Sequence, residues 1–403
     1  MKYDFDRTID RKGTGSVKWD HVDALFRGVG LLPLWVADMD FESPPEVIAA
    51  LAERARHGVF GYTMAGPESR DALIAWFLER HGWPIDPSWL LHAPGVVPAL
   101  NILIQTLTDP GDRIIIQKPV YHPFATSIEK NGREILNNPL VLEDGAYRMD
   151  FDDLARKAAD PRARLMILCN PHNPVGRAWR REELQRLGGI CASRGITVIS
   201  DEIHCDLVHP GHRHIPFATS GEECLMNSIT CLSPGKTFNL AGLQTADLVI
   251  PREDHRKAYR DALERLGILG PNLFAIEAAR AAYLHGASWL DALMPYLMEN
   301  LTRLRESLSS GMEGVTLIGP EATYLAWLDF RGRGLNGKAL KHLLREGARV
   351  ALVEGRVFGA AEGDGFARIN FACPRTILDE ALGRIRSALG APYTPHPRSG
   401  PSV

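Results

Sequence analysis

The sequence has no uninterrupted apolar stretch approaching the ~18 residues that a membrane-spanning helix needs, so we expect no membrane partner. Its first residues, Met1 to Asp6, lack the apolar core and the cleavage pattern of a signal peptide. The formal net charge of −3 gives no electrostatic basis for binding nucleic acid. These absences favour a cytoplasmic globular protein without nucleic-acid or membrane partners.

Cysteine is scarce, and none of the six cysteines forms a Cys-x-x-Cys pair. Their spacing suits no zinc site, and a disulfide framework is not expected in a cytoplasmic chain of this size. Histidines gather in one stretch, but their spacing within a Pro/Gly-containing loop is irregular. We therefore predict no metal site. The histidines of that stretch are His204, His209, His212 and His214.

The middle of the chain alternates short apolar runs with amphipathic helical stretches such as Arg181 to Ser193. The runs are apolar on both faces, which is typical of strands covered by helices on both sides. This alternation predicts an α/β fold with a doubly wound, mainly parallel sheet. The strand candidates are Arg113 to Gln117, Leu165 to Cys169, Thr197 to Ser200, Ser228 to Leu232 and Ala246 to Ile250.

The pattern changes near Ser288, and 403 residues are more than one compact core usually serves. A long helical segment and two later strand candidates indicate a smaller α+β unit, with which the first 45 residues are expected to pack. The predicted organisation is a large domain over 46–287, a small domain over 1–45 and 288–390, and a loose Pro-rich tail over 391–403.

Polar residues follow three successive strand candidates. Asn173, Asp201 and Lys236 each come shortly after a buried run. Taken singly, they could belong to a turn, a helix cap and a solvated surface. Since ligands of open α/β sheets bind beyond the carboxyl ends of the strands, the three together predict one site with an amide, a carboxylate and an amine.

This combination resembles the fold-type-I family of pyridoxal 5′-phosphate (PLP) enzymes, the aspartate aminotransferase superfamily. The resemblance implies the PLP-dependent transferase fold, with PLP held as a Schiff base on Lys236, which also acts as general base. It implies that Asp201 keeps the pyridine nitrogen protonated. It also implies that Asn173 donates to the phenolic oxygen of the ring and contacts the substrate.

Further positions match the same family. Tyr121 matches the aromatic residue that stacks on the ring and takes part in catalysis, and Arg368 matches the arginine that binds the substrate's α-carboxylate. Tyr62 matches a tyrosine that reaches the phosphate across a dimer interface, which implies a homodimer with shared active sites. The remaining cofactor-binding positions implied are Gly95, Val96 and Val97 at a helix start, His204 and Ser233.

Three motifs narrow the resemblance to the cystathionine β-lyase (C–S lyase) branch, which includes the maltose-regulon modulator. They are the segments Leu34 to Phe41, Asp201 to His204 and Lys236 to Gln244. Within them, His204 and Gln244 stand where many aminotransferases have a tyrosine and an arginine. Gly235 stands where a serine is common, which leaves one phosphate contact open.

The leading interpretation is a PLP-dependent lyase acting on an amino-acid substrate. It would eliminate a thiol from L-cystathionine or another S-substituted cysteine and release pyruvate and ammonia. An aminotransferase is the first alternative, because both reactions begin by removing the Cα proton. The second is a regulatory PLP-binding protein that acts through a partner. The sequence does not identify the leaving group.

Overall fold

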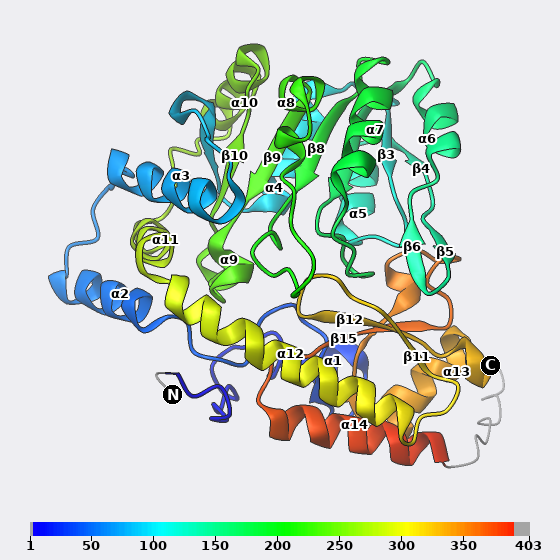
Figure 1. Ribbon diagram of the computed structural model, residues 1–403. Coiled ribbons are helices and arrows are strands. Elements are labelled where there is room, and N and C mark those ends of the chain that lie inside the picture. The colour runs from blue at the N-terminus through cyan, green and yellow to red at the C-terminus, as the bar shows by residue number, and fades with distance from the viewer. Residues whose placement is uncertain (1–2, 391–403) are drawn as a thin grey trace, which may run out of the picture.

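The computed structural model describes residues 3–390, so the predicted tail over 391–403 lies outside the described residues. Figure 1 shows a large helix-covered sheet and, below it in this view, a smaller sheet flanked by the long helices α12 (Ala287–Ser309) and α14 (Arg375–Gly390). The predicted α/β class is confirmed. None of the helices within 3–390 combines the length and apolar character that crossing a membrane requires.

Seven strands form the large sheet, in the order β2-β10-β9-β8-β7-β3-β4. The pairings from β9 to β4 are parallel, whereas β10 runs antiparallel to both of its neighbours. The sheet is therefore mainly parallel, as predicted, with one reversed strand. The strands are β2 (Leu90–Ala93), β3 (Arg113–Ile116), β4 (Glu134–Asn137), β7 (Ala163–Cys169), β8 (Thr197–Asp201), β9 (Ser228–Leu232) and β10 (Ala246–Val249).

The central strands divide their apolar side chains between two cores. In β3, Ile114 and Ile116 pack into one buried cluster, and Ile115 packs into the other. Helices cover both faces, which explains why these strands show no polar alternation. On one face lie α4 (Val96–Leu107), α5 (Pro123–Lys130) and α10 (Glu253–Arg265), and on the other lie α6 (Phe151–Ala158), α7 (Arg181–Ala192) and α8 (Glu222–Met226).

The smaller sheet has four antiparallel strands in the order β11-β12-β15-β14. One buried cluster joins the two sheets, since it contains Leu232 at the end of β9 and Leu325 and Ile369 of the small sheet. Helices α2 (Pro45–His57), α3 (Pro67–His81) and α11 (Leu273–His285) contribute to the same cluster. The strands are β11 (Thr316–Ile318), β12 (Leu325–Asp329), β14 (Val353–Glu354) and β15 (Phe366–Asn370).

The N-terminal segment lies against the C-terminal part of the chain. Strand β1 (Leu32–Pro33) pairs in parallel with β13 (Val350–Ala351). Residues 34–41, here called the N-terminal strap, follow β1, and Asn370 Nδ2 donates to the carbonyl oxygens of Val36 and Asp38 within it, each at 2.6 Å. The strap therefore lies beside the small sheet, while the predicted domain boundaries remain predictions.

Candidate active site

The carboxyl ends of β7, β8 and β9 lie side by side in the large sheet. In the ladder, Asp201 is opposite Cys169 of β7 and Cys231 of β9. This register places the residues that follow each strand around one cavity of about 490 Å³. Predicted site residues in its lining are Tyr121, Asn173, Asp201, His204, Lys236 and Arg368.

Asp201 is buried and almost without partners. The residue is 3% exposed, and the one hydrogen bond that its carboxylate accepts within 3–390 comes from the backbone N–H of Ile203 at 3.3 Å. Burial raises the pKa of this carboxyl to about 7, although the Ile203 N–H and the charge of Lys236 act in the opposite direction. A carboxylate in this position favours a cationic hydrogen-bond donor from the cavity.

Lys236 lies on the one-turn helix α9 (Pro234–Thr237), directly after β9. Its Nζ donates a hydrogen bond to the carbonyl oxygen of Ala37 in the N-terminal strap at 2.7 Å. Burial, followed by the nearby charge of Arg368, lowers the pKa of Lys236 to about 8. A substantial share of this amine is therefore neutral near physiological pH, and a neutral amine can add to a carbonyl carbon.

Arg368 of β15 reaches into the same cavity and is 5% exposed. Its guanidinium donates to Asn173 Oδ1 at 2.9 Å and to the carbonyl oxygen of Trp35 at 2.8 Å, and it lies 4.9 Å from the Phe358 ring centroid. Its Nε has no partner among the described residues. Since Asn173 Oδ1 accepts from Arg368, the Nδ2 group of Asn173 is left as a donor.

A second cavity, of about 360 Å³, shares Tyr121, Asp201 and Lys236 with the first. It is lined by the start of α4, where Gly95 has a φ of 140°, a conformation that L side chains rarely adopt. The first N–H groups of a helix have no intrahelical acceptor, so those of Val96 and Val97 are available to an anion. Pro98 has no N–H to add.

Ser233 and Gly235 line the second cavity next to α9. The Ser233 hydroxyl accepts from the Gly235 N–H at 3.0 Å and donates to the Thr245 carbonyl oxygen at 2.8 Å. A Cβ at Gly235 would lie 3.1 Å from Ser233 Oγ, which is tighter than an ordinary contact. The glycine therefore leaves room for the hydroxyl that caps this turn.

Tyr121 lines both cavities, and His204 lines the first. Burial and the nearby charge of Asp201 raise the pKa of Tyr121, so the phenol is protonated. Burial holds the pKa of His204 well below its ordinary value, and its Nδ1 has no partner within 3–390. His204 is therefore neutral and packs edge-on against Tyr324, with ring centroids 5.9 Å apart.

The residues fit PLP at three separate points. The helix start at Val96 and Val97 suits the phosphate, the buried carboxylate of Asp201 suits a protonated pyridine nitrogen, and the Lys236 amine suits the aldehyde. Tyr62 is not part of this arrangement, because its side chain is fully exposed and lines neither cavity of its own chain. Its predicted role in a shared site stays a prediction.

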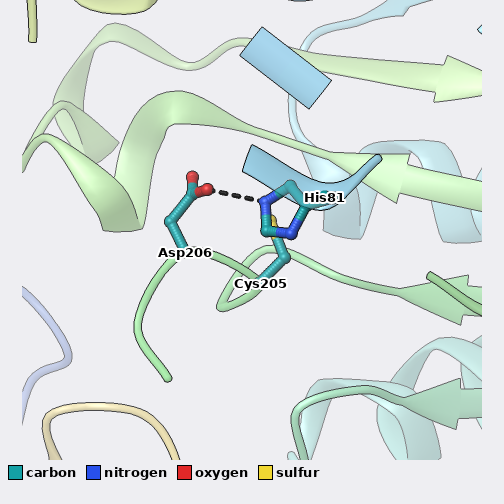
Figure 2. Close-up of side chains that lie close together, drawn as sticks. All are labelled: His81, Cys205 and Asp206. Atoms are coloured by element: carbon teal, nitrogen blue, oxygen red, sulfur yellow. Dashed lines mark hydrogen bonds and ion pairs between the residues drawn. The ribbon is translucent and has the colours of Figure 1, made fainter. Parts of the chain in front are cut away.

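Asp206 and the side chains that bond to it form a separate group of buried polar residues, here called the rear network. Asp206 accepts hydrogen bonds from Thr237 Oγ1 at 2.8 Å, His81 Nε2 at 2.8 Å and Trp76 Nε1 at 3.0 Å. Figure 2 shows the carboxylate facing His81, with Cys205 beside them. Burial raises the pKa of the Cys205 thiol well above its usual value. Because the acceptors of Asp206 are in use and the thiol beside it is protonated, this cluster does not offer a metal ion a free ligand.

The rear network continues to a second carboxylate. Glu202 accepts from Ser200 Oγ, His214 Nε2 and the Phe217 backbone N–H, each at 2.8 Å. The histidines of the predicted loop have separate surroundings, since His209 contacts the carbonyl oxygens of Pro320 and Thr323. Glu202 therefore differs from its neighbour Asp201, because three protein donors satisfy its carboxylate.

Several cavity residues could not be found from the sequence. Arg345 and Glu354 line the 490 Å³ cavity, and Tyr324 donates at 2.9 Å to the carbonyl oxygen of Ala37, another lining residue. No strand-end pattern marks these residues, because they reach the cavity from the small sheet and its loops. The Leu34–Phe41 motif was the one available signal for the strap.

Comparison with known proteins agrees with this geometry. The family model described as aminotransferase class I and II matches residues 30–385. Cystathionine β-lyase PatB of Bacillus subtilis is 46% identical over 96% of this chain and 99% of its own length. A PLP-bound putative aminotransferase from Clostridium difficile has a TM-score of 0.94 at 41% identity, covering 96% of this chain and all of that one. Cystalysin from Treponema denticola, solved with PLP, has a TM-score of 0.92 at 35% identity, covering 96% and 99%.

Proposed function

The chain belongs to the class I and II aminotransferase family, and from that premise we propose that it is a PLP-dependent carbon–sulfur lyase. The resemblance to the C–S lyase branch is confirmed by the relative named cystathionine β-lyase. The reaction eliminates a thiol from L-cystathionine or another S-substituted cysteine and gives pyruvate and ammonia. The observation that carries the proposal is the buried carboxylate of Asp201, which accepts one long backbone hydrogen bond and lies in one cavity with Lys236.

Each part of the cofactor has a matching group in this chain. When bound, PLP withdraws electrons from the Cα atom of an attached amino acid. Lys236 would hold it covalently, and Asp201 would pair with the ring nitrogen. Asn173 Nδ2 and the neutral His204 would lie on the side of the phenolic oxygen, and Tyr121 against the ring. The phosphate would take the N–H groups of Val96 and Val97, with Gly95 allowing close approach and Ser233 at the edge.

The chain's own residues then orient the substrate and move a proton. Arg368 binds the α-carboxylate, for which its free Nε and its buried position are suited. Fixing that carboxylate sets the direction of the Cα–H bond. The Lys236 amine, with a pKa near 8, takes the Cα proton and can later return it.

A second candidate, transamination, is favoured by the similarity to the Clostridium difficile protein that is described as a putative aminotransferase. The two reactions differ after the Cα proton has left, because elimination needs a β-leaving group. The purified protein loaded with PLP should release pyruvate from L-cystathionine many times faster than it transfers the amino group of L-alanine to an oxo acid. Faster transfer than elimination would replace the lyase assignment with the aminotransferase.

We also propose a cytoplasmic homodimer in which each subunit completes the other's site. The exposed Tyr62 side chain lies in the connection between α2 and α3 and has no role in its own subunit's cavities. Mixing Tyr62→Ala and Lys236→Ala proteins under subunit exchange should restore activity, since a mixed dimer has one intact site. Verified exchange without recovery would show that Tyr62 does not serve a neighbouring site.

A further inference from the structure

The N-terminal strap supplies backbone acceptors to both Lys236 and Arg368. The carbonyl oxygen of Ala37 accepts from Lys236 Nζ at 2.7 Å, and that of Trp35 accepts from the Arg368 guanidinium at 2.8 Å. Lys236 and Arg368 are far apart in the sequence, on α9 and β15, and the strap contacts both of them. The position of the strap therefore affects where both side chains point.

Ion pairs tie the strap to the segment that precedes it in the chain. Arg11 donates to both carboxylate oxygens of Asp38, at 2.7 and 3.2 Å, and to Asp40 Oδ1 at 2.7 Å. Lys18 Nζ donates to Asp40 Oδ2 at 2.7 Å, and Trp19 Nε1 donates to Asp40 Oδ1 at 2.8 Å. Two carboxylates of the strap are thus held by one group of donors, here called the N-terminal clamp (Arg11, Lys18 and Trp19).

The two ion pairs of the clamp differ in burial. The side chains of Lys18 and Asp40 are 1% and 3% exposed, whereas those of Arg11 and Asp38 are 23% and 21% exposed. Removing one partner of a fully buried pair leaves a charge without compensation and destabilises the fold strongly. Water reaches the pair of Arg11 and Asp38, so either residue can be changed at a lower cost in stability.

The turns that carry the clamp are themselves ordered by hydrogen bonds. Residues 11–20 form turns, in which Asp20 accepts from the backbone N–H groups of Gly13 at 2.8 Å and Ser16 at 3.0 Å. The Thr14 hydroxyl donates to the carbonyl oxygen of Arg11 at 2.7 Å. The Arg11 side chain therefore starts from a fixed backbone, which a contact that positions another segment requires.

We propose that Arg11 is a positioning residue that acts on the reaction through Asp38 and the strap. With Asp38 held in place, the neighbouring carbonyl oxygen of Ala37 keeps its position against Lys236, and the strap's other acceptor does the same for Arg368. Neither Arg11 nor Asp38 lines the two cavities of the site. This inference rests on the proposed roles of Lys236 and Arg368 and adds to them a residue that lies outside the cavities.

A carbonyl acceptor suits an amine that has to take up a proton. The neutral Lys236 amine donates an N–H to Ala37 and keeps its lone pair free, because a carbonyl oxygen can only accept. Once the amine has taken a proton, its bond to the same oxygen is charge-assisted and stronger. A displaced Ala37 oxygen therefore slows proton transfer, and a displaced Trp35 oxygen weakens substrate binding through Arg368.

Other contacts of the strap limit the effect that the loss of Arg11 can have. Asn370 holds two strap carbonyls, and Asn239 Nδ2 donates to those of Met39 and Phe41 at 3.0 and 2.9 Å. These bonds involve the backbone and remain when Arg11 is replaced, so the strap loosens without leaving its place. Because a misplacement of about 1 Å costs about a hundredfold in rate, we expect a loss of about tenfold from a partial loosening.

Steady-state kinetics of the PLP-loaded protein with L-cystathionine test the proposal. Arg11→Gln should lower kcat about tenfold and raise KM about threefold, since the strap contacts both the base and the carboxylate-binding residue. Asp38→Asn should give a similar loss, and the double variant should lose no more than either single one, because the two residues act as a unit. Arg11→Lys keeps the charge without the planar fork and should recover part of the loss. Losses that multiply in the double variant would show that Arg11 does not act through Asp38.

A matched control is available in the same part of the chain. Arg7 forms an ion pair with Glu42, the residue directly after the strap, and their side chains are 57% and 56% exposed. Arg7→Gln should leave kcat and KM unchanged. If Arg11→Gln lowers the thermal stability but matches Arg7→Gln in both kinetic constants, the clamp serves folding alone and the positioning role is refuted.

Hydrogen exchange of the PLP-loaded protein separates the clamp from the lyase reaction. The backbone amides of the strap should exchange about tenfold faster in Arg11→Gln than in the wild type, while those of β8 should exchange at the same rate in both. Unchanged exchange of the strap would overturn the proposal, whatever the kinetics. Faster exchange of the strap, in a protein whose wild type releases no pyruvate, would support the hold of Arg11 on the strap and overturn the lyase function instead.

Discussion

Asp201 and Asp206 lie five residues apart, are both buried, and differ in what surrounds them. Asp206 in the rear network accepts three side-chain hydrogen bonds, which lower its pKa in spite of burial. Asp201 accepts one long backbone bond, and burial raises its pKa to about 7. The same residue type is thus stabilised by three side-chain donors in one case and by a single long backbone hydrogen bond in the other.

The difference indicates which carboxylate serves the fold and which serves a ligand. A buried charge without a partner costs several kcal/mol, so it is retained where a ligand supplies the partner. On the cavity side, His204 Nδ1 and Arg368 Nε lack partners as well. The cavity thus holds several polar atoms that a ligand could satisfy, and the variants below test the contrast between Asp201 and Asp206 in order of expected effect.

The largest difference in effect should come from two adjacent residues, Lys236 in the cavity and Thr237 in the rear network. Lys236→Ala removes the amine that holds the cofactor and moves the Cα proton, so turnover should fall by more than about a thousandfold. Thr237→Val removes one hydrogen bond to Asp206 and should lower turnover by less than about tenfold. Pyruvate release from L-cystathionine measures both. Similar losses would show that the rear network shares directly in the chemistry.

The cofactor-free protein should lose stability as the pH rises because of Asp201. The unfolded carboxyl releases its proton near pH 3.8, whereas the folded one keeps it to about pH 7. Between these values the folded state binds more protons, so the free energy of unfolding falls with rising pH, by up to about 4 kcal/mol for a shift of this size.

Denaturant unfolding from pH 4 to pH 7.5 measures this fall. Asp201→Asn should remove that part of the decline. Asp247, whose pKa burial also raises to about 7, contributes equally to both proteins and cancels in the comparison. Parallel stability curves for wild type and variant would show that Asp201 is ionised in the folded protein throughout, contrary to its observed surroundings.

In the holoenzyme the same substitution should act on turnover. Asparagine has nearly the same shape but cannot hold a proton on the ring nitrogen, so Asp201→Asn should lower kcat by about a hundredfold, taking about 3 kcal/mol for the broken buried pair. The visible absorbance of the bound cofactor should persist, since Lys236 is intact. A variant with wild-type kcat would exclude the proposed role of Asp201.

The smallest catalytic effect should come from Asp206→Asn. The amide keeps one acceptor but presents donors to groups that are themselves donors, so the protein should lose about 2 kcal/mol of stability. Turnover per folded molecule should change less than tenfold. Thermal unfolding and pyruvate release, measured on one preparation, give both numbers. A large loss of kcat with unchanged stability would reverse the contrast between the two aspartates.

The sequence allowed the inner site to be predicted and missed its outer part for a physical reason. Asn173, Asp201 and Lys236 could be found because parallel strands bring their carboxyl ends to one edge. The direction of β10 could not be predicted, because an apolar run does not show whether a strand runs parallel or antiparallel to its neighbours. Arg345 and Glu354 meet the cavity only through the packing of the small sheet, which neither periodicity nor a local motif encodes. The roles assigned to the inner residues remain proposals.

The pairing of Leu32 with Val350 has a consequence for the order of events during synthesis. It closes a loop of most of the chain, and contacts of such long sequence separation form late because of their entropic cost. Strand β8, which carries Asp201, and strand β9, which precedes Lys236, can pair before the ribosome has made Arg368, which arrives on β15 near the end. The part that attaches the cofactor can thus exist before the part that recognises the substrate. A nascent chain would acquire chemical reactivity first and selectivity last.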